Sequence, residues 1–70
     1  MPVDLDALIR LSDGREVAVA ILDLSSNGCR VSTRQMIPVG DVVQLVVPDR
    51  HSFQAYVGWT TLNRAGLKFI

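Results

Sequence analysis

The chain contains 70 residues, 49% of them hydrophobic, and its seven basic side chains balance seven acidic ones. This length suits one domain, which we place over residues 1–70, and the apolar content excludes an intrinsically disordered chain. Zero net charge argues against a dedicated nucleic-acid binder, because such domains are usually strongly basic, so we expect no DNA or RNA partner.

The first half of the chain has the pattern of three strands joined by tight turns. Val3 to Ser12 alternates apolar and polar residues, and a Val-rich run follows from Glu16 to Leu22. Asp13-Gly14 and Asn27-Gly28 are hairpin signals, because Asn and Gly tolerate positive φ. We therefore expect strands over residues 3–12, 16–22 and 29–33, with Val3, Leu5, Ala7, Ile9 and Leu11 facing inward.

The second half predicts three more strands. Pro38 and Gly40 interrupt an irregular stretch, and Pro48 ends the next apolar run. An exposed Trp can stack a nucleic-acid base, but Trp59 continues the apolar phase of its strand, so we expect it in the core with Phe53, Ala55 and Val57. We expect strands over residues 41–47, 53–61 and 67–70, a connection at 34–40, a loop at 48–52 and a turn at 63–66.

Six short strands without a run of helical periodicity predict an all-β fold, either a small barrel or a sandwich. Closing the sheet would remove exposed strand edges. A chain of this length buries only about 60% of its unfolded surface, so its margin of stability is thin. A homodimer that covers leftover apolar surface is therefore a further hypothesis.

Residue sets for catalysis or metal binding are not evident, so we expect neither an enzyme nor a cofactor. His51 is the single histidine and lies in a polar loop. Cys29 is the single cysteine, which excludes an intramolecular disulfide, and its apolar surroundings predict a buried thiol. No window approaches the about 20 uninterrupted apolar residues of a membrane span, and no signal peptide opens the sequence. We expect a cytoplasmic protein.

Asp23, Ser25 and Gly28 are the candidate site residues. They place a carboxylate and a hydroxyl next to bare backbone, between the second and third predicted strands. A plain hairpin is the alternative interpretation, because Asp, Ser, Asn and Gly are the ordinary turn residues.

The arrangement Asp23-x-Ser25-x-x-Gly28 resembles the second signature of the PilZ domain family. The strand order and the ending Gly66-Leu67-x-Phe69 are also similar to that family, and the resemblance covers nearly the whole chain. It implies a small six-stranded antiparallel β-barrel that binds the bacterial second messenger cyclic di-GMP. It further implies that the three residues bind this ligand, since a carboxylate accepts the N–H donors of guanine.

The other signature of the family, Arg-x-x-x-Arg on a segment before the first strand, has no match here. Arg30 and Arg34 have that spacing, but they follow the motif on a predicted strand, about 13 Å apart, so we do not transfer the role to them. Each lost phosphate contact costs roughly 1.5–3 kcal/mol, and the loss of both moves a micromolar binder toward millimolar or worse.

We therefore expect a non-enzymatic signalling module with weak or no cyclic di-GMP binding that acts through contacts with a protein partner. A genuine cyclic di-GMP receptor, a small nucleic-acid-binding barrel and a purely structural or dimerisation domain are the alternatives.

Overall fold

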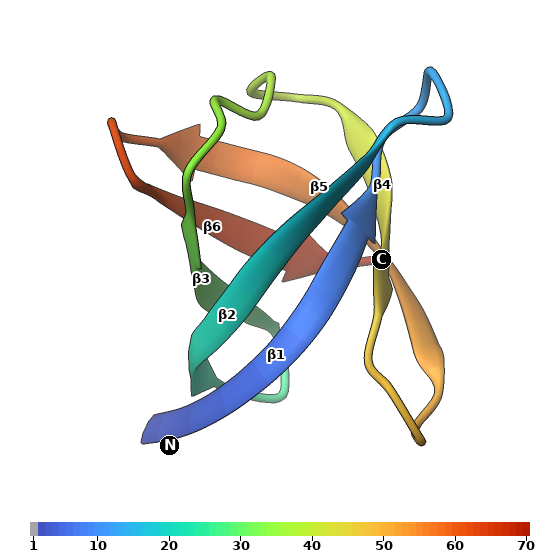
Figure 1. The fold of residues 1–70 in the computed structure, drawn as a ribbon, viewed down its shortest axis with the longest axis vertical. Helices are drawn as coiled ribbons and strands as arrows, with labels where there is room; N and C mark the ends of the chain where they lie inside the picture. Colours follow the sequence, from blue (N-terminus) through green and yellow to red (C-terminus); the bar gives the residue numbers. More distant parts are fainter. Residues whose placement is uncertain (1) are drawn as a thin grey trace.

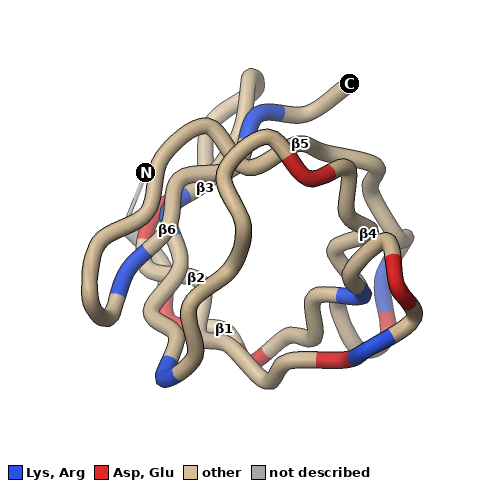
Figure 2. Tube along the Cα trace, turned by 90° about the horizontal axis from the view of Figure 1, so that it is seen from above, with Lys and Arg blue, Asp and Glu red and all other residues tan. Residues whose placement is uncertain are grey.

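The computed structural model describes residues 2–70 as six strands, with no helix among them, that close into one barrel (Figure 1). The predicted all-β, six-stranded antiparallel barrel is confirmed. Around the barrel the strands follow the order β1-β2-β3-β6-β5-β4, and seen from one end they form a ring that carries charges of both signs (Figure 2). The strands are β1 (Pro2–Arg10), β2 (Glu16–Leu24), β3 (Gly28–Thr33), β4 (Val42–Val46), β5 (Ser52–Thr60) and β6 (Arg64–Phe69).

Side chains at alternate positions fill the inside of the barrel along most of each strand, as a period of two requires, and bulges in β2 and β5 interrupt the alternation. The largest fully buried side chains are Ile9, Ile21, Ile37, Leu45, Val31 and Val57. The predicted inward row of the first strand is confirmed for Ala7, Ile9 and Leu11, which are buried. Leu5 is 36% exposed instead, because β1 pairs with β4 only through Leu8–Arg10 and Leu5 lies beyond that contact.

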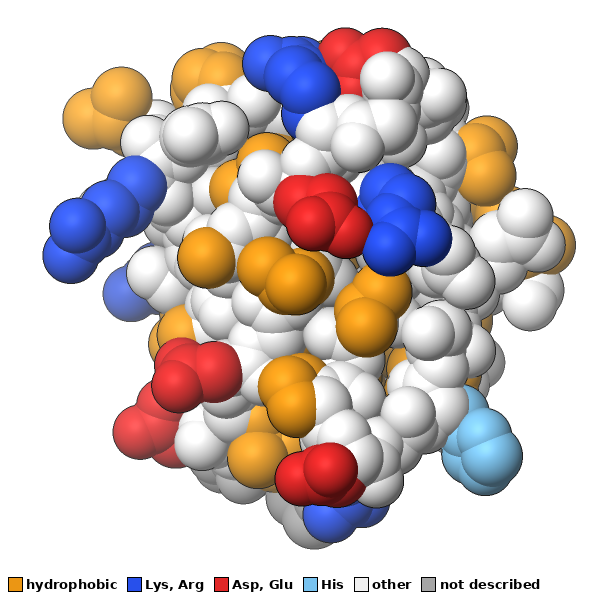
Figure 3. Space-filling model, turned by 45° about the vertical axis from the view of Figure 1, so that its right-hand side comes forward, with side chains coloured by type: hydrophobic (Ala, Val, Ile, Leu, Met, Phe, Trp, Pro, Cys, Tyr) orange, Lys and Arg blue, Asp and Glu red, His pale blue; other side chains and the backbone are white. Residues whose placement is uncertain are grey.

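Apolar side chains also lie on the outer surface. Leu8, Val42 and Tyr56 are each more than a third exposed. Figure 3 shows hydrophobic side chains on one outer face, between carboxylates and basic groups. Residues 2–70 form one layer of strands without a helix, so no second layer covers these side chains.

The turn between β2 and β3 differs from the predicted Asn-Gly reversal. Its N–H···O bond runs from Ser25 to the carbonyl of Gly28 at 2.9 Å. Within residues 2–70, positive φ occurs at Gly14, Gly40 and Asp49, so Asn27 does not adopt the expected conformation and neither does Gly28. The Asp13-Gly14 prediction is confirmed, since Gly14 has φ of 92°.

Gly28 is required because β3 and β6 approach each other closely there. A Cβ on Gly28 would collide with the carbonyl oxygen of Leu67 and would lie 3.1 Å from the Cα of Lys68. Both atoms belong to backbone, which cannot move without disturbing the β3–β6 pairing. Steric space, rather than turn conformation, therefore explains the glycine.

A β-bulge in β2 reverses the inside–outside alternation of that strand. Ile21 lies opposite Val31 and Asp23 lies opposite Arg30, so Leu22 is an extra residue relative to β3. Without it, Asp23 would share the inward side of Ile21, which is 1% exposed. With this extra residue in place, the Asp23 carboxylate reaches Arg30 on the outer face, and Leu24 packs against the core.

A second bulge, in β5, has the same effect on Trp59. Val57 pairs with Leu67 and Trp59 pairs with Gly66, so Gly58 is the extra residue. Val57 stays inside, while Trp59 is turned outward and is 42% exposed. The prediction of Trp59 in the core is therefore wrong.

Phe53 was also predicted inside, but it lies at one end of the barrel and is 40% exposed. It stacks there on Phe69, with ring centroids 5.4 Å apart. A second hollow, of about 540 Å³, opens at this end between residues that include Leu24, Phe53, Phe69 and Ile70.

The sixth strand was predicted too short: it begins at Arg64, and the turn before it spans 61–63.

Replacing Gly28 by Ala should lower the free energy of unfolding by about 1–3 kcal/mol, because the new methyl group forces β3 and β6 apart. Gly58→Ala is the matched control, since its Cβ would meet its nearest neighbours at 3.7 and 3.9 Å, which is ordinary contact. Urea unfolding of both variants measures the difference. Equal stability of the two would contradict the close approach of the strands.

Burial raises the pKa of the Cys29 thiol to about 11. The unfolded thiol ionises near pH 8.5, so the stabilising contribution is complete below about pH 8.5 and is lost as the pH rises toward 11. Between these limits the wild type should lose up to about 3 kcal/mol of unfolding free energy relative to Cys29→Ala. Urea unfolding of both proteins across this range tests the prediction, and parallel pH profiles would exclude it.

Candidate functional site

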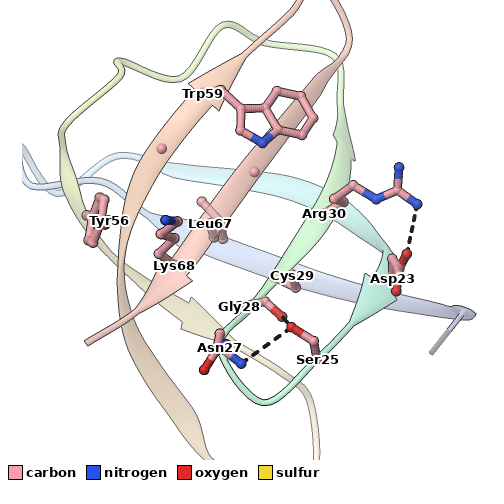
Figure 4. Close-up of a pocket in the computed structure, with 12 residues that line it drawn as sticks. Asp23, Ser25, Asn27, Gly28, Cys29, Arg30, Tyr56, Trp59, Leu67 and Lys68 are labelled. Atoms are coloured by element: carbon pink, nitrogen blue, oxygen red, sulfur yellow. Dashed lines mark hydrogen bonds and ion pairs between the residues drawn. The ribbon is translucent and has the colours of Figure 1, made fainter.

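The two bulges bring side chains from four neighbouring strands to a hollow of about 570 Å³ on the outer face of the barrel (Figure 4). A volume of this size is typical of small-molecule sites. We call this hollow the groove. Its lining residues are Asp23, Ser25, Asn27, Gly28, Cys29, Arg30, Tyr56, Gly58, Trp59, Gly66, Leu67 and Lys68.

The structure places all three sequence-predicted residues at the groove. Asp23 comes from the end of β2, Ser25 from the turn and Gly28 from the start of β3. Asp23 lies on the strand and Ser25 lies just beyond it, so the bulge and the turn, rather than an unbroken strand, bring them together.

Asp23 forms an ion pair with Arg30, with an N–O distance of 2.8 Å. The two residues are direct partners across the β2–β3 ladder, so their proximity follows from the register. Cations that hydrogen-bond the Asp23 carboxyl, Arg30 among them, hold its pKa below the ordinary value. The carboxylate is thus ionised and partly exposed, in a form that accepts hydrogen bonds.

Ser25 stabilises its own turn. Its hydroxyl donates to the carbonyl oxygen of Gly28 at 3.2 Å and accepts the N–H of Asn27 at 3.4 Å. Figure 4 shows these bonds at the lower end of the groove. A ligand that uses the Ser25 hydroxyl has to share it with the turn.

Two aromatic side chains border the groove on the β5 side. The indole of Trp59 lies against Gly66, where a Cβ would collide with the ring nitrogen of the indole and would lie 2.8 Å from a ring carbon. Tyr56 precedes Trp59 on β5, and Lys68 is its direct partner on β6 (Figure 4). The glycine lets the indole lie low on the sheet, so its outer face is available for stacking.

Four of these side chains escaped prediction from sequence: Arg30, Tyr56, Trp59 and Lys68. Gly58 was a usable signal, because an isolated glycine inside a strand pattern suggests a bulge, and a bulge would have turned Trp59 outward. Predicting that Arg30 lies at the groove would have required the register of β2 and β3, which places it opposite Asp23.

The groove combines one carboxylate, two basic groups and two aromatic rings. Aromatic faces stack planar bases, basic groups attract phosphate, and a carboxylate accepts base N–H donors. Within residues 2–70 no group of three or more potential ligands could hold a metal ion. This chemistry suits a nucleotide better than a metal or an uncharged apolar molecule.

The comparisons with known proteins agree with this geometry. The family model of the PilZ domain matches residues 1–70, the whole chain. No curated protein matches it. In the part of the chain that the structure describes, no helix is long and apolar enough to cross a membrane. With the family model covering the full length and the six strands closed into a barrel, the chain belongs to the PilZ domain family.

Proposed function

We propose that this chain is a non-enzymatic signalling module whose groove recognises cyclic di-GMP weakly and which acts through contacts with a partner protein in the cytoplasm. Membership of the PilZ family suggests a cyclic di-GMP-binding signalling module. The weak affinity, the residues involved and the protein partner are what the proposal adds.

One observation carries the proposal: residues from four strands meet in one groove with the groups that a guanine nucleotide needs. The Asp23 carboxylate can accept the N–H donors of a guanine, and such charge-assisted bonds are stronger than neutral ones. The exposed face of the Trp59 indole can stack on the base. Lys68 and Arg30 can attract the phosphates.

The affinity is weak because the groove residues are already engaged with one another. Among residues 2–70, Arg30 and Lys68 are the basic side chains that line the groove, and Arg30 is bound to Asp23. A guanine at Asp23 and a phosphate at Arg30 both compete with this ion pair. Losing one charge-assisted contact of roughly 1.5–3 kcal/mol weakens binding about 10- to 100-fold.

Trp59, the only tryptophan, reports binding through its fluorescence. Titration with cyclic di-GMP should quench it with a dissociation constant of about 0.1–1 mM, and Asp23→Ala should bind at least about tenfold more weakly. Asp49→Asn is the control: it removes a carboxylate in the β4–β5 loop, and Asn tolerates the positive φ of 61° there.

Sub-micromolar binding would replace the weak-binding proposal with a genuine receptor. No response at millimolar ligand, or equal affinities of wild type and Asp23→Ala, would exclude recognition at the groove.

A further inference from the structure

One side of β1 is unpaired near its beginning. β1 pairs with β2 at Pro2 and again from Leu5 to Arg10, with a shift of register between Pro2 and Leu5, but it pairs with β4 only through Leu8–Arg10. Within residues 2–70, no strand pairs with residues 3–7 on the side away from β2. Figure 1 shows β1 diverging from β4 toward its amino end. We call residues 3–7 the β1 edge; its alternate backbone N–H and C=O groups are available to another strand.

The side chains of the β1 edge alternate between two environments. Val3 packs against the core and Ala7 is buried, while Leu5, between them, is opposite buried Ile21 and is 36% exposed. The residues between these, at positions 4 and 6, are exposed aspartates. No ion pair in the described part of the chain involves either carboxylate.

We propose that the β1 edge binds an extended segment of a partner protein as an added strand. This partner segment carries basic residues at alternate positions. Backbone hydrogen bonds would hold such a strand, as in other cases of strand addition. Its basic side chains would lie opposite Asp4 and Asp6, and an apolar residue between them would cover Leu5. The inference deepens the proposed function, on which it rests, because it assigns a surface to the protein contact.

The charges of the edge select against a second copy of the chain. Antiparallel pairing of two β1 edges would place Asp4 and Asp6 of one copy opposite those of the other. Like charges directly opposite each other destabilise a strand pair, whereas opposite charges stabilise it. The two aspartates therefore discourage self-association and favour a basic partner strand.

Two peptides of equal length test the proposal, one alternating Lys with Val and the other Glu with Val. In amide-resolved NMR the lysine peptide should shift the signals of residues 3–7 and slow their hydrogen exchange, while the glutamate peptide should leave them unchanged. A lysine peptide N-methylated at every second amide keeps its charge and loses the backbone donors on one side, so it should bind at least about tenfold more weakly. Equal binding of the methylated and unmethylated peptides would overturn strand addition.

The paired substitution Asp4→Lys and Asp6→Lys should weaken binding of the lysine peptide about tenfold or more and create binding of the glutamate peptide. Asp49→Asn should change neither. Unchanged preference in the charge-swapped variant would overturn the proposal, as would a dimer of the wild-type chain that protects residues 3–7 from exchange. Binding of the peptides is measured from the NMR signals of the β1 edge, and binding of cyclic di-GMP is measured at the groove. Failure of one proposal can therefore be distinguished from failure of the other.

Discussion

The extra residues Leu22 in β2 and Gly58 in β5 determine which side chains this barrel presents to solvent. In an unbroken strand, Asp23 would follow Ile21 inward, and a buried carboxylate without a partner is costly. Trp59 would likewise be forced into an interior already filled, at close to native packing density, by small and branched side chains. Each bulge shifts the alternation by one position and turns a polar or large residue outward. The groove is a consequence of both shifts.

Close backbone approach then shapes the groove. Gly28 on β3 and Gly66 on β6 line the groove without side chains, so the floor of the groove there is backbone. The indole of Trp59 lies against this floor at Gly66. The ion pair of Asp23 with Arg30 joins β2 to β3 at the rim and occupies both groups. The same region of β2 pairs with the beginning of β1, at Pro2, so the groove and the β1 edge lie on adjoining strands. The proposed nucleotide groove and the proposed β1 edge thus lie close to each other on the barrel, on neighbouring strands.

Local patterns were sufficient to predict six strands, an all-β fold and the Asp13-Gly14 turn, because period and turn chemistry are properties of a few neighbouring residues. The patterns left a barrel and a sandwich both open, and the resemblance to the PilZ family indicated the barrel. The outward position of Trp59 depends on pairing with a strand that follows it in the chain, and so was not predictable from alternation alone. The role of Gly28 also depends on a strand later in the chain, since the atom that excludes a side chain there is the carbonyl oxygen of Leu67 on β6. Arg30 was set aside because it follows the motif on a predicted strand, away from the place of the missing signature, whereas its partner across the ladder, Asp23, decides its position.

The most direct test of a groove built by two bulges is the location of bound cyclic di-GMP, measured from backbone-amide and indole N–H shifts of the labelled protein. The predicted result is a cluster of shifts on β2, β3, β5 and β6 that includes Asp23, Arg30 and the Trp59 indole. Shifts confined to the second hollow, beside Phe53 and Phe69, would contradict the account, as would the absence of any change at the Trp59 indole.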